Sequence, residues 1–96
     1  DRYQANIATL AGTHTLTFDD VKIQTLDPGG AGRDVILPAD EESAGLTYIL
    51  KNAADASEAL TVKDDGGATI ATVAQDEAAF FFHDGTGWHG GVLKAT

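Results

Sequence analysis

Histidine is the residue of this chain best suited to acid–base catalysis or metal binding, and it occurs at His14, His83 and His89. His83 and His89 flank the same Asp-Gly-Thr-Gly turn, so we expect them to lie near each other. Three histidines without a supporting set of ligands are more typical of polar strand positions than of a metal centre. The serines, Ser43 and Ser57, lack the surroundings of an activated nucleophile. We therefore predict no catalytic residue, no metal site and no enzymatic activity.

Adjacent acidic residues occur at four places: Asp19-Asp20, Glu41-Glu42, Asp64-Asp65 and Asp76-Glu77. Glycoside hydrolysis needs two carboxylates that face each other across a cleft. An EF-hand needs acidic residues at alternate positions, followed by a later glutamate. The chain shows no such spacing, and neighbouring acids in turns usually point to solvent. We interpret these pairs as solvated turn residues.

The glycine-rich segment 29–34 resembles a nucleotide-binding loop only in composition. It contains no Gly-Lys-Ser/Thr sequence, and no long helix follows it. A turn between two strands explains the glycines, because glycine adopts positive φ without strain. We predict no cofactor.

The overall charge limits the possible partners. Lys and Arg number 6 against 15 Asp and Glu, which gives a net charge of −9 and a pI near 4.3. The few basic residues are scattered, so we predict binding neither to nucleic acid nor to an anionic membrane. A basic protein surface would suit the charge better. The absence of cysteine excludes disulfides and thiolate zinc sites, and no apolar run is long enough to span a membrane.

From residue 14 onward, apolar and polar residues alternate in short runs separated by turns, as in β-strands. The expected strands are 14–18, 21–26, 33–37, 46–52, 59–63, 68–73, 78–83 and 88–92. We predict an all-β fold, an antiparallel β-sandwich or barrel of about eight short strands. Because no helix is long enough to connect parallel strands, a parallel α/β sheet is disfavoured. Residues 39–45 are expected to form at most one helical turn, with Asp40 as its cap and Gly45 at its end.

Residues 1–12 precede this pattern, and we expect them to form an N-terminal arm on a β-domain of residues 13–96. Tyr3, Ile7 and Leu10 are the apolar residues of this segment that we predict to contact a partner. Their spacing also fits one face of a helix. A helix this short is marginal without packing, which favours the arm.

Residues 78–92 combine an aromatic run with the Asp-Gly turn, and they predict a β-hairpin that closes the fold. Trp88, the only tryptophan, opens the second strand of this hairpin. In a domain this small such a residue most often seals one end of the core. The alternative is that Trp88 and Tyr48 form an exposed platform on which a sugar stacks.

Several short sequence motifs, taken in their order along the chain, resemble a domain that recurs in structural proteins of tailed bacteriophages. They are Asp34-Val35-Ile36-Leu37-Pro38, Gly45-Leu46-Thr47-Tyr48-Ile49-Leu50-Lys51-Asn52, Leu60-Thr61-Val62, Gly67-Ala68-Thr69-Ile70, Ala79-Phe80, Asp84-Gly85-Thr86 and Trp88. The resemblance covers roughly residues 14 to 92. It assigns no role to His83 or His89.

The resemblance implies a virion structural protein. Because the sequence shows no collagen-like repeat, coiled coil or second domain, it looks like the kind that serves as a capsid decoration (cement) protein and stabilises the head shell. The implied partner is the major capsid protein, and the implied assembly is a homo-oligomer, typically a trimer at threefold positions. The protein would be made in the bacterial cytoplasm and reside on the capsid surface. A receptor- or glycan-binding module of a tail fibre or adhesin is the alternative, and an oligomerisation or spacer domain is a third possibility.

Overall fold

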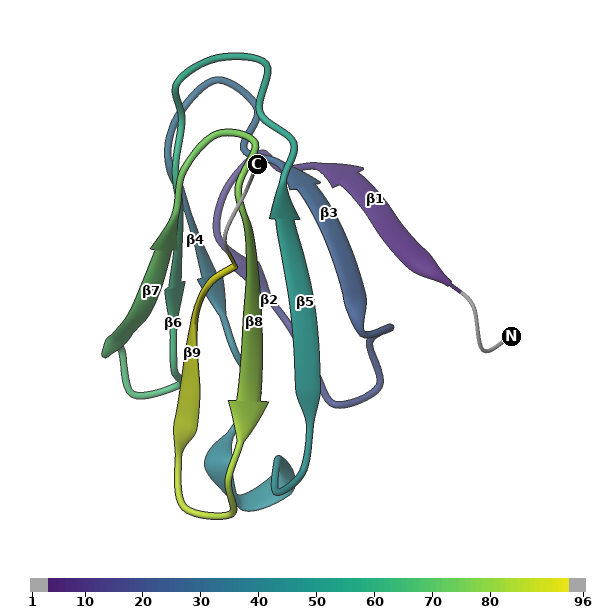
Figure 1. The fold of residues 1–96 in the computed structure, drawn as a ribbon, viewed down its shortest axis with the longest axis vertical. Helices are drawn as coiled ribbons and strands as arrows, with labels where there is room; N and C mark the ends of the chain where they lie inside the picture. Colours follow the sequence, from purple (N-terminus) through teal and green to yellow (C-terminus); the bar gives the residue numbers. More distant parts are fainter. Residues whose placement is uncertain (1–3, 94–96) are drawn as a thin grey trace.

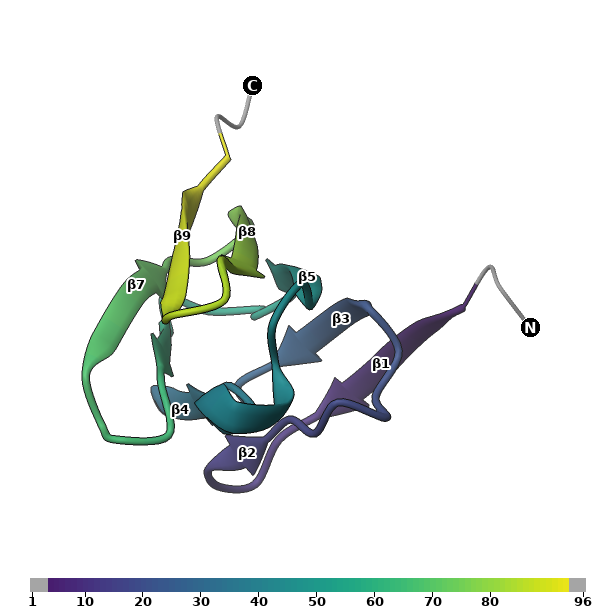
Figure 2. The ribbon, with the colours of Figure 1, turned by 90° about the horizontal axis from the view of Figure 1, so that it is seen from below.

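The first six of the nine described strands alternate between two stacked β-sheets (Figures 1 and 2). The structure is a computed structural model that describes residues 4–93. Sheet A contains, in spatial order, β1 (Ala5–Thr9), β3 (Ile23–Asp27), β5 (Thr47–Asn52), β8 (Ala78–His83) and β9 (Trp88–Val92). Sheet B contains β2 (His14–Thr15), β4 (Arg33–Ile36), β6 (Leu60–Lys63) and β7 (Thr69–Val73). The all-β fold is confirmed, as a sandwich rather than a closed barrel.

The pairing within the sheets is mixed, which differs from the antiparallel arrangement that we expected. β1, β3 and β5 run parallel in sheet A, and β2, β4 and β6 run parallel in sheet B. The antiparallel pairs are β5 with β8, β6 with β7, and β8 with β9. Parallel neighbours need a crossover connection, which is usually a helix. Here a strand of the opposite sheet serves as that crossover, so no helix is required.

Alternation along each strand places one set of side chains between the sheets. β5 shows it most clearly, because Tyr48, Leu50 and Asn52 are buried whereas the residues between them are exposed. The core contains Leu10, Leu16, Leu26, Val35, Leu37, Tyr48, Leu50, Leu60, Val62, Val73, Ala79, Phe81 and Trp88. Contributions from both sheets make this a single core.

A buried amide holds the connection after β5. The side-chain Nδ2 of Asn52 donates to the carbonyl oxygens of Glu58 and Val73, each at 2.8 Å. Its Oδ1 accepts from the backbone N–H of Ala54 at 2.9 Å. These bonds satisfy the polar atoms of a fully buried side chain, which would otherwise be costly to desolvate. Asn52 therefore fixes the path of the chain from sheet A to sheet B.

The expected arm contains a strand of the sandwich itself. Residues 5–9 form β1 at one edge of sheet A, where they pair in parallel with β3 (Figure 1). The side chain of Asn6 donates to Gln24 on β3 at 2.9 Å, and Leu10 then enters the core. Sheet A thus begins inside the segment 1–12 that we separated from the β-domain. This segment is extended, not helical, within its described residues.

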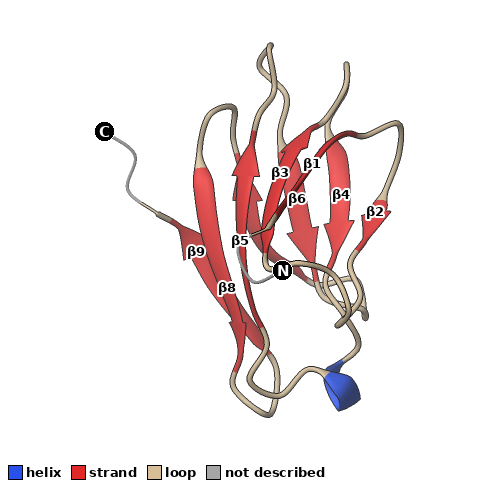
Figure 3. Ribbon diagram, turned by 90° about the vertical axis from the view of Figure 1, so that its right-hand side faces the viewer, coloured by secondary structure: helices blue, strands red, loops and turns tan. Residues whose placement is uncertain are grey.

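The single helical turn that we expected is present as η1, a 3-10 turn at Asp40–Glu42 (Figure 3). Our assignment of Asp40 as its cap was wrong. Ala39 occupies the N-cap position, and no side chain caps the turn. The Asp40 carboxylate instead contacts His83 on β8. The physical reason is that the Asp40 carboxylate finds a partner on another element, because Nε2 of His83 lies 3.0 Å away. A turn of three residues offers few free N–H groups to compete with it.

Gly90 provides a test of how tightly the hairpin packs. A Cβ at this position would overlap the carbonyl oxygen of Phe80 and the ring of Phe81. We expect Gly90→Ala to lower the free energy of unfolding by about 1–3 kcal/mol, because the core would have to shift to accept the methyl group. Urea unfolding followed by circular dichroism measures this change.

Gly91→Ala is the matched control, since a Cβ there meets nothing within 4 Å. Its stability should stay within about 0.5 kcal/mol of the wild type. Equal stability of the two variants would contradict the packing described for β9.

Candidate functional site

His83, which sequence reasoning considered for metal binding, is a structural residue at the end of the sandwich. Its ring is buried, and Nδ1 accepts the backbone N–H of Gly85 at 3.1 Å. This contact places the proton of the neutral ring on Nε2, which lies 3.0 Å from the Asp40 carboxylate. The nearby hydroxyl of Ser43 donates to the carbonyl of Ala39, so it is not aligned as a nucleophile. His83 joins the last hairpin to η1.

Trp88 seals the same end of the core, as the sequence favoured. Its side chain is 6% exposed, and its indole N–H donates to the carbonyl of Pro38 at 2.9 Å. The rings of Tyr48 and His83 lie against it, with centroids 6.0 and 5.3 Å away. Tyr48 is itself fully buried. These two aromatic side chains are therefore not available as a platform for a sugar.

The three histidines do not converge. His89 lies on the outer side of β9, where its Nε2 is 2.9 Å from the exposed carboxylate of Asp84. His83 points inward from β8, and His14 lies in sheet B on β2. The Nε2 atom of His14 is buried and has no hydrogen-bond partner. In the described part of the chain, no histidine takes part in a cluster of potential metal ligands.

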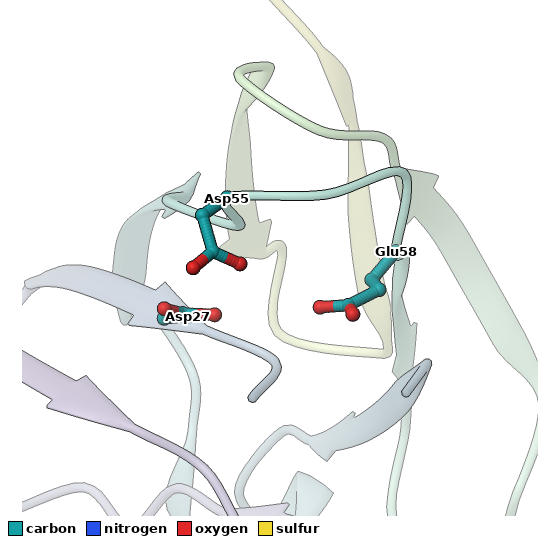
Figure 4. Close-up of side chains that lie close together, drawn as sticks. All are labelled: Asp27, Asp55 and Glu58. Atoms are coloured by element: carbon teal, nitrogen blue, oxygen red, sulfur yellow. The ribbon is translucent and has the colours of Figure 1, made fainter. Parts of the chain in front are cut away.

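One group of carboxylates is close enough to hold a cation: Asp27, Asp55 and Glu58, whose nearest oxygens lie within 4.8 Å of one another (Figure 4). They come from the end of β3 and from the loop between β5 and β6. Backbone N–H groups already occupy two of them, because Gly29 donates to Asp27 and Gly30 donates to Glu58. Exposed acidic groups commonly gather without an ion, and we assign none to them.

Two of the residues that we predicted to contact a partner, Ile7 and Leu10, have different surroundings in the structure. Ile7 is 78% exposed on the outer side of β1, whereas Leu10 is 8% exposed and belongs to the core. Tyr3 lies outside the described residues. The spacing of three between Ile7 and Leu10 explains the division, because an odd spacing in an extended chain places two side chains on opposite sides.

The surface that combines exposed apolar groups is the outer face of sheet A. We use this name for the side chains at odd positions of β1, β3, β5 and β9 and at even positions of β8. Ile23, Ile49 and Phe82 are more than a third exposed on this face. Sequence reasoning missed it, although uninterrupted apolar runs at 48–50 and 80–82 were a signal. Such runs are typical of strands that are covered on both faces.

A shallow hollow of about 630 Å³ adjoins this face at the start of β1. It is lined by Gln4, Ala5, Asn6, Asp19, Asp20 and Val21. The hollow is open to solvent and presents two carboxylates but no nucleophile and no basic group. Within residues 4–93, no helix is long and apolar enough to cross a membrane.

Comparison with known proteins gives no relative: no protein-family model, no curated protein and no solved structure matches this chain.

Burial, with a smaller contribution from the carboxylates of Asp20 and Asp19, raises the pKa of Tyr48 from 10.0 to about 12. The neutral phenol donates to the carbonyl of Thr17 at 2.7 Å. A raised pKa means that the fold favours the protonated phenol of Tyr48. The resulting stabilisation of the folded state is fully present below pH 10 and is lost as the pH rises towards 12.

We expect the phenolate absorbance of a Tyr3→Phe variant, in which Tyr48 is the remaining tyrosine, to appear near pH 12. In urea the transition should return to about pH 10. A transition near pH 10 in the folded protein would contradict the burial of Tyr48.

The backbone N–H groups of Gly87 and Thr86 donate to Asp84 and, with His89, lower its pKa to about 2. A lowered pKa means that the stabilising effect is present above the ordinary pKa of 3.8 and is lost as the pH falls towards 2. We expect the Asp84 carboxyl to titrate near pH 2 by NMR. In Asp84→Asn the stability should depend less on pH between 4 and 2, and an unchanged dependence would show that the turn does not hold the carboxylate as described.

Proposed function

We propose that this chain is a virion structural protein that decorates and stabilises the head shell of a tailed bacteriophage. The resemblance across residues 14 to 92 supports this proposal, and the two-layer β fold is compatible with it. The single observation that carries it is the free edge of β1, with the exposed Ile7 beside it. The described residues offer an edge strand and an exposed apolar side chain, which are the groups that this contact would use.

The edge of β1 suits contact with a shell through the backbone. Among the described strands, β1 is the last of sheet A on its side, so half of its N–H and C=O groups point away from β3 (Figure 1). An open edge can accept a strand of another protein, which then gains ladder hydrogen bonds. Ile7 would add an apolar contact to this pairing. The partner in this proposal is the major capsid protein.

The contact differs from the arm that the sequence suggested. A loose arm would leave the sandwich to reach the shell, whereas β1 is held within sheet A by pairing with β3. The shell therefore meets the sandwich directly, at the edge of a sheet. Leu10 takes no part in this contact, because it is buried in the core.

The same proposal places the protein on the capsid surface after synthesis in the bacterial cytoplasm, as a homo-oligomer that the resemblance suggests is a trimer. The alternative, a receptor- or glycan-binding module, required Trp88 and Tyr48 on the surface. Because both side chains are buried, they give this alternative no support.

A point substitution at the edge tests the proposal. Ile7→Asp introduces a charge beside the open edge, where a bound strand would have to desolvate it. We expect the affinity for head shells that lack the protein to fall about tenfold or more. Co-sedimentation with shells measures the binding, and the shell's resistance to heat measures the stabilisation. Removing residues 1–12 would be less informative, because it would also remove Leu10 from the core.

Thr72→Asp is the matched control, because Thr72 is exposed on β7, the edge strand of sheet B at the opposite end of the fold. This variant should bind as the wild type does. If the two variants bind equally well, β1 is not the contact. If the wild-type protein neither binds shells in a fixed ratio nor protects them from heat, the proposed function itself is wrong.

A further inference from the structure

β1 differs from the other edge strands of the sandwich. β2, at the edge of sheet B, has only two residues, and the remaining edge strands, β7 and β9, lie beside each other. β1 is five residues long, and Figure 1 shows it at the margin of the fold. It carries none of the charged residues or prolines by which edge strands usually avoid pairing with other chains. Among the described strands, it is therefore the edge best suited to take up a further strand.

The backbone of β1 presents alternate residues to its open side. The N–H of Leu10, just after β1, donates to the carbonyl of Asp27 at 2.8 Å, so the backbone of Leu10 faces β3. Successive residues of a paired strand direct their backbone groups to opposite sides. Ala5, Ile7 and Thr9 therefore direct their N–H and C=O groups away from β3, and a bound strand would pair with them. Because the side chain of Ile7 is exposed beside these groups, an apolar residue of the bound strand would be favoured next to it.

The hollow described above lies at the Ala5 end of this edge, and Asp19 and Asp20 line it. One oxygen of Asp20 accepts from the backbone N–H and the hydroxyl of Thr17, at 2.7 and 3.3 Å. Lys22, the nearest basic residue along the chain, donates to backbone carbonyls rather than to these carboxylates. Neither carboxylate takes part in an ion pair within the described residues. The negative charge at this end of β1 is therefore not neutralised by the described part of the chain.

We propose that the strand that pairs with β1 is an extended segment of a partner protein, with a lysine or arginine at the end that lies beside Ala5. Charge complementarity argues for this occupant, because the cation would reach Asp19 and Asp20, whereas a neutral or acidic segment would leave both carboxylates without a counter-charge. The net charge of −9 favours the approach of a basic segment as well. Use of the β1 edge rests on the proposed function, and the basic residue is what is added to it.

The length of β1 limits how strongly a single segment binds. A strand that matches its five residues spans roughly 17 Å and gains a few ladder hydrogen bonds. Ordering a free peptide offsets much of this gain, so we expect a dissociation constant of about 1 mM or weaker for a short peptide. A segment that its own protein already holds extended would bind more tightly, because less conformational entropy is lost.

An NMR titration of the purified protein with two synthetic peptides tests the proposal. The probe is acetyl-Lys-Thr-Val-Thr-Val-Thr-Lys-amide, in which a lysine lies beside Ala5 whichever way the strand runs, and its counterpart has glutamate at both ends. We expect the lysine peptide to bind about fivefold more tightly or better at low salt. This preference should shrink at about 0.5 M NaCl, because salt screens exposed charges. The amide signals of Ala5, Ile7 and Thr9 should shift, while those of β7 stay constant.

Asp19→Lys and Asp65→Lys are a matched pair of variants, because both aspartates are exposed and Asp65 lies in the turn between β6 and β7 of sheet B. Asp19→Lys should abolish the preference for the lysine peptide and lower the affinity for head shells about fivefold or more. Asp65→Lys makes the same change in net charge and should keep both properties of the wild type. The comparison therefore separates the local charge of the hollow from the overall charge of the protein.

The proposal is overturned if the lysine peptide does not bind at about 10 mM, if both peptides bind equally, or if the shifts lie away from β1. It is also overturned if Asp65→Lys removes the preference as fully as Asp19→Lys. Binding to shells distinguishes this failure from failure of the proposed function. Shells that bind the wild type and Asp19→Lys equally well would retain the decoration function and exclude the basic residue. Shells that do not bind the wild type would contradict the function, while the peptides still determine the chemistry of the edge.

Discussion

The alternation of successive strands between two sheets is the constraint on which this structure depends. From β1 to β6 each strand crosses to the opposite sheet, so the next strand but one returns beside the first, in parallel and in a fixed register. A shift of one residue would exchange the buried and exposed faces of a strand. The register that buries Leu50 between the sheets therefore also places Ile49 on the outer face. The same strand register therefore produces both the buried core and the exposed apolar surface of sheet A.

The last hairpin closes one end of this arrangement. Trp88 and His83 bind groups before and within η1, so residues far apart in the chain meet beneath the core. Their polar atoms are used in these contacts, so neither Trp88 nor His83 offers a free functional group at the surface. These two side chains therefore stabilise the fold. The exposed His89 on the same hairpin stacks instead on Phe82 at the outer face of sheet A.

The sequence predicted what depends on local pattern. All eight expected strands and the single helical turn are present, although the strand expected at 14–18 covers only His14–Thr15, and Trp88 is buried as its position suggested. The parallel pairing was not predictable, because alternation shows which side of a strand is buried but not which strand lies beside it. β1 was missed for a related reason: its apolar residues are few, and pairing with β3 stabilises it more than its own pattern does. The odd spacing of Ile7 and Leu10 was the available signal that one of them would be buried.

A two-layer β fold covers only the inner face of each sheet, and the two outer faces differ here. On sheet B, the outward residues include Thr61 and the ion pair of Lys63 with Asp34, which water solvates readily. On sheet A, water meets isoleucine and phenylalanine in aligned rows. Hydrophobic burial favours covering the second surface with a third layer, and this chain has no further element among its described strands to supply one. The exposed apolar side chains and the backbone edge of β1 thus lie on the same sheet.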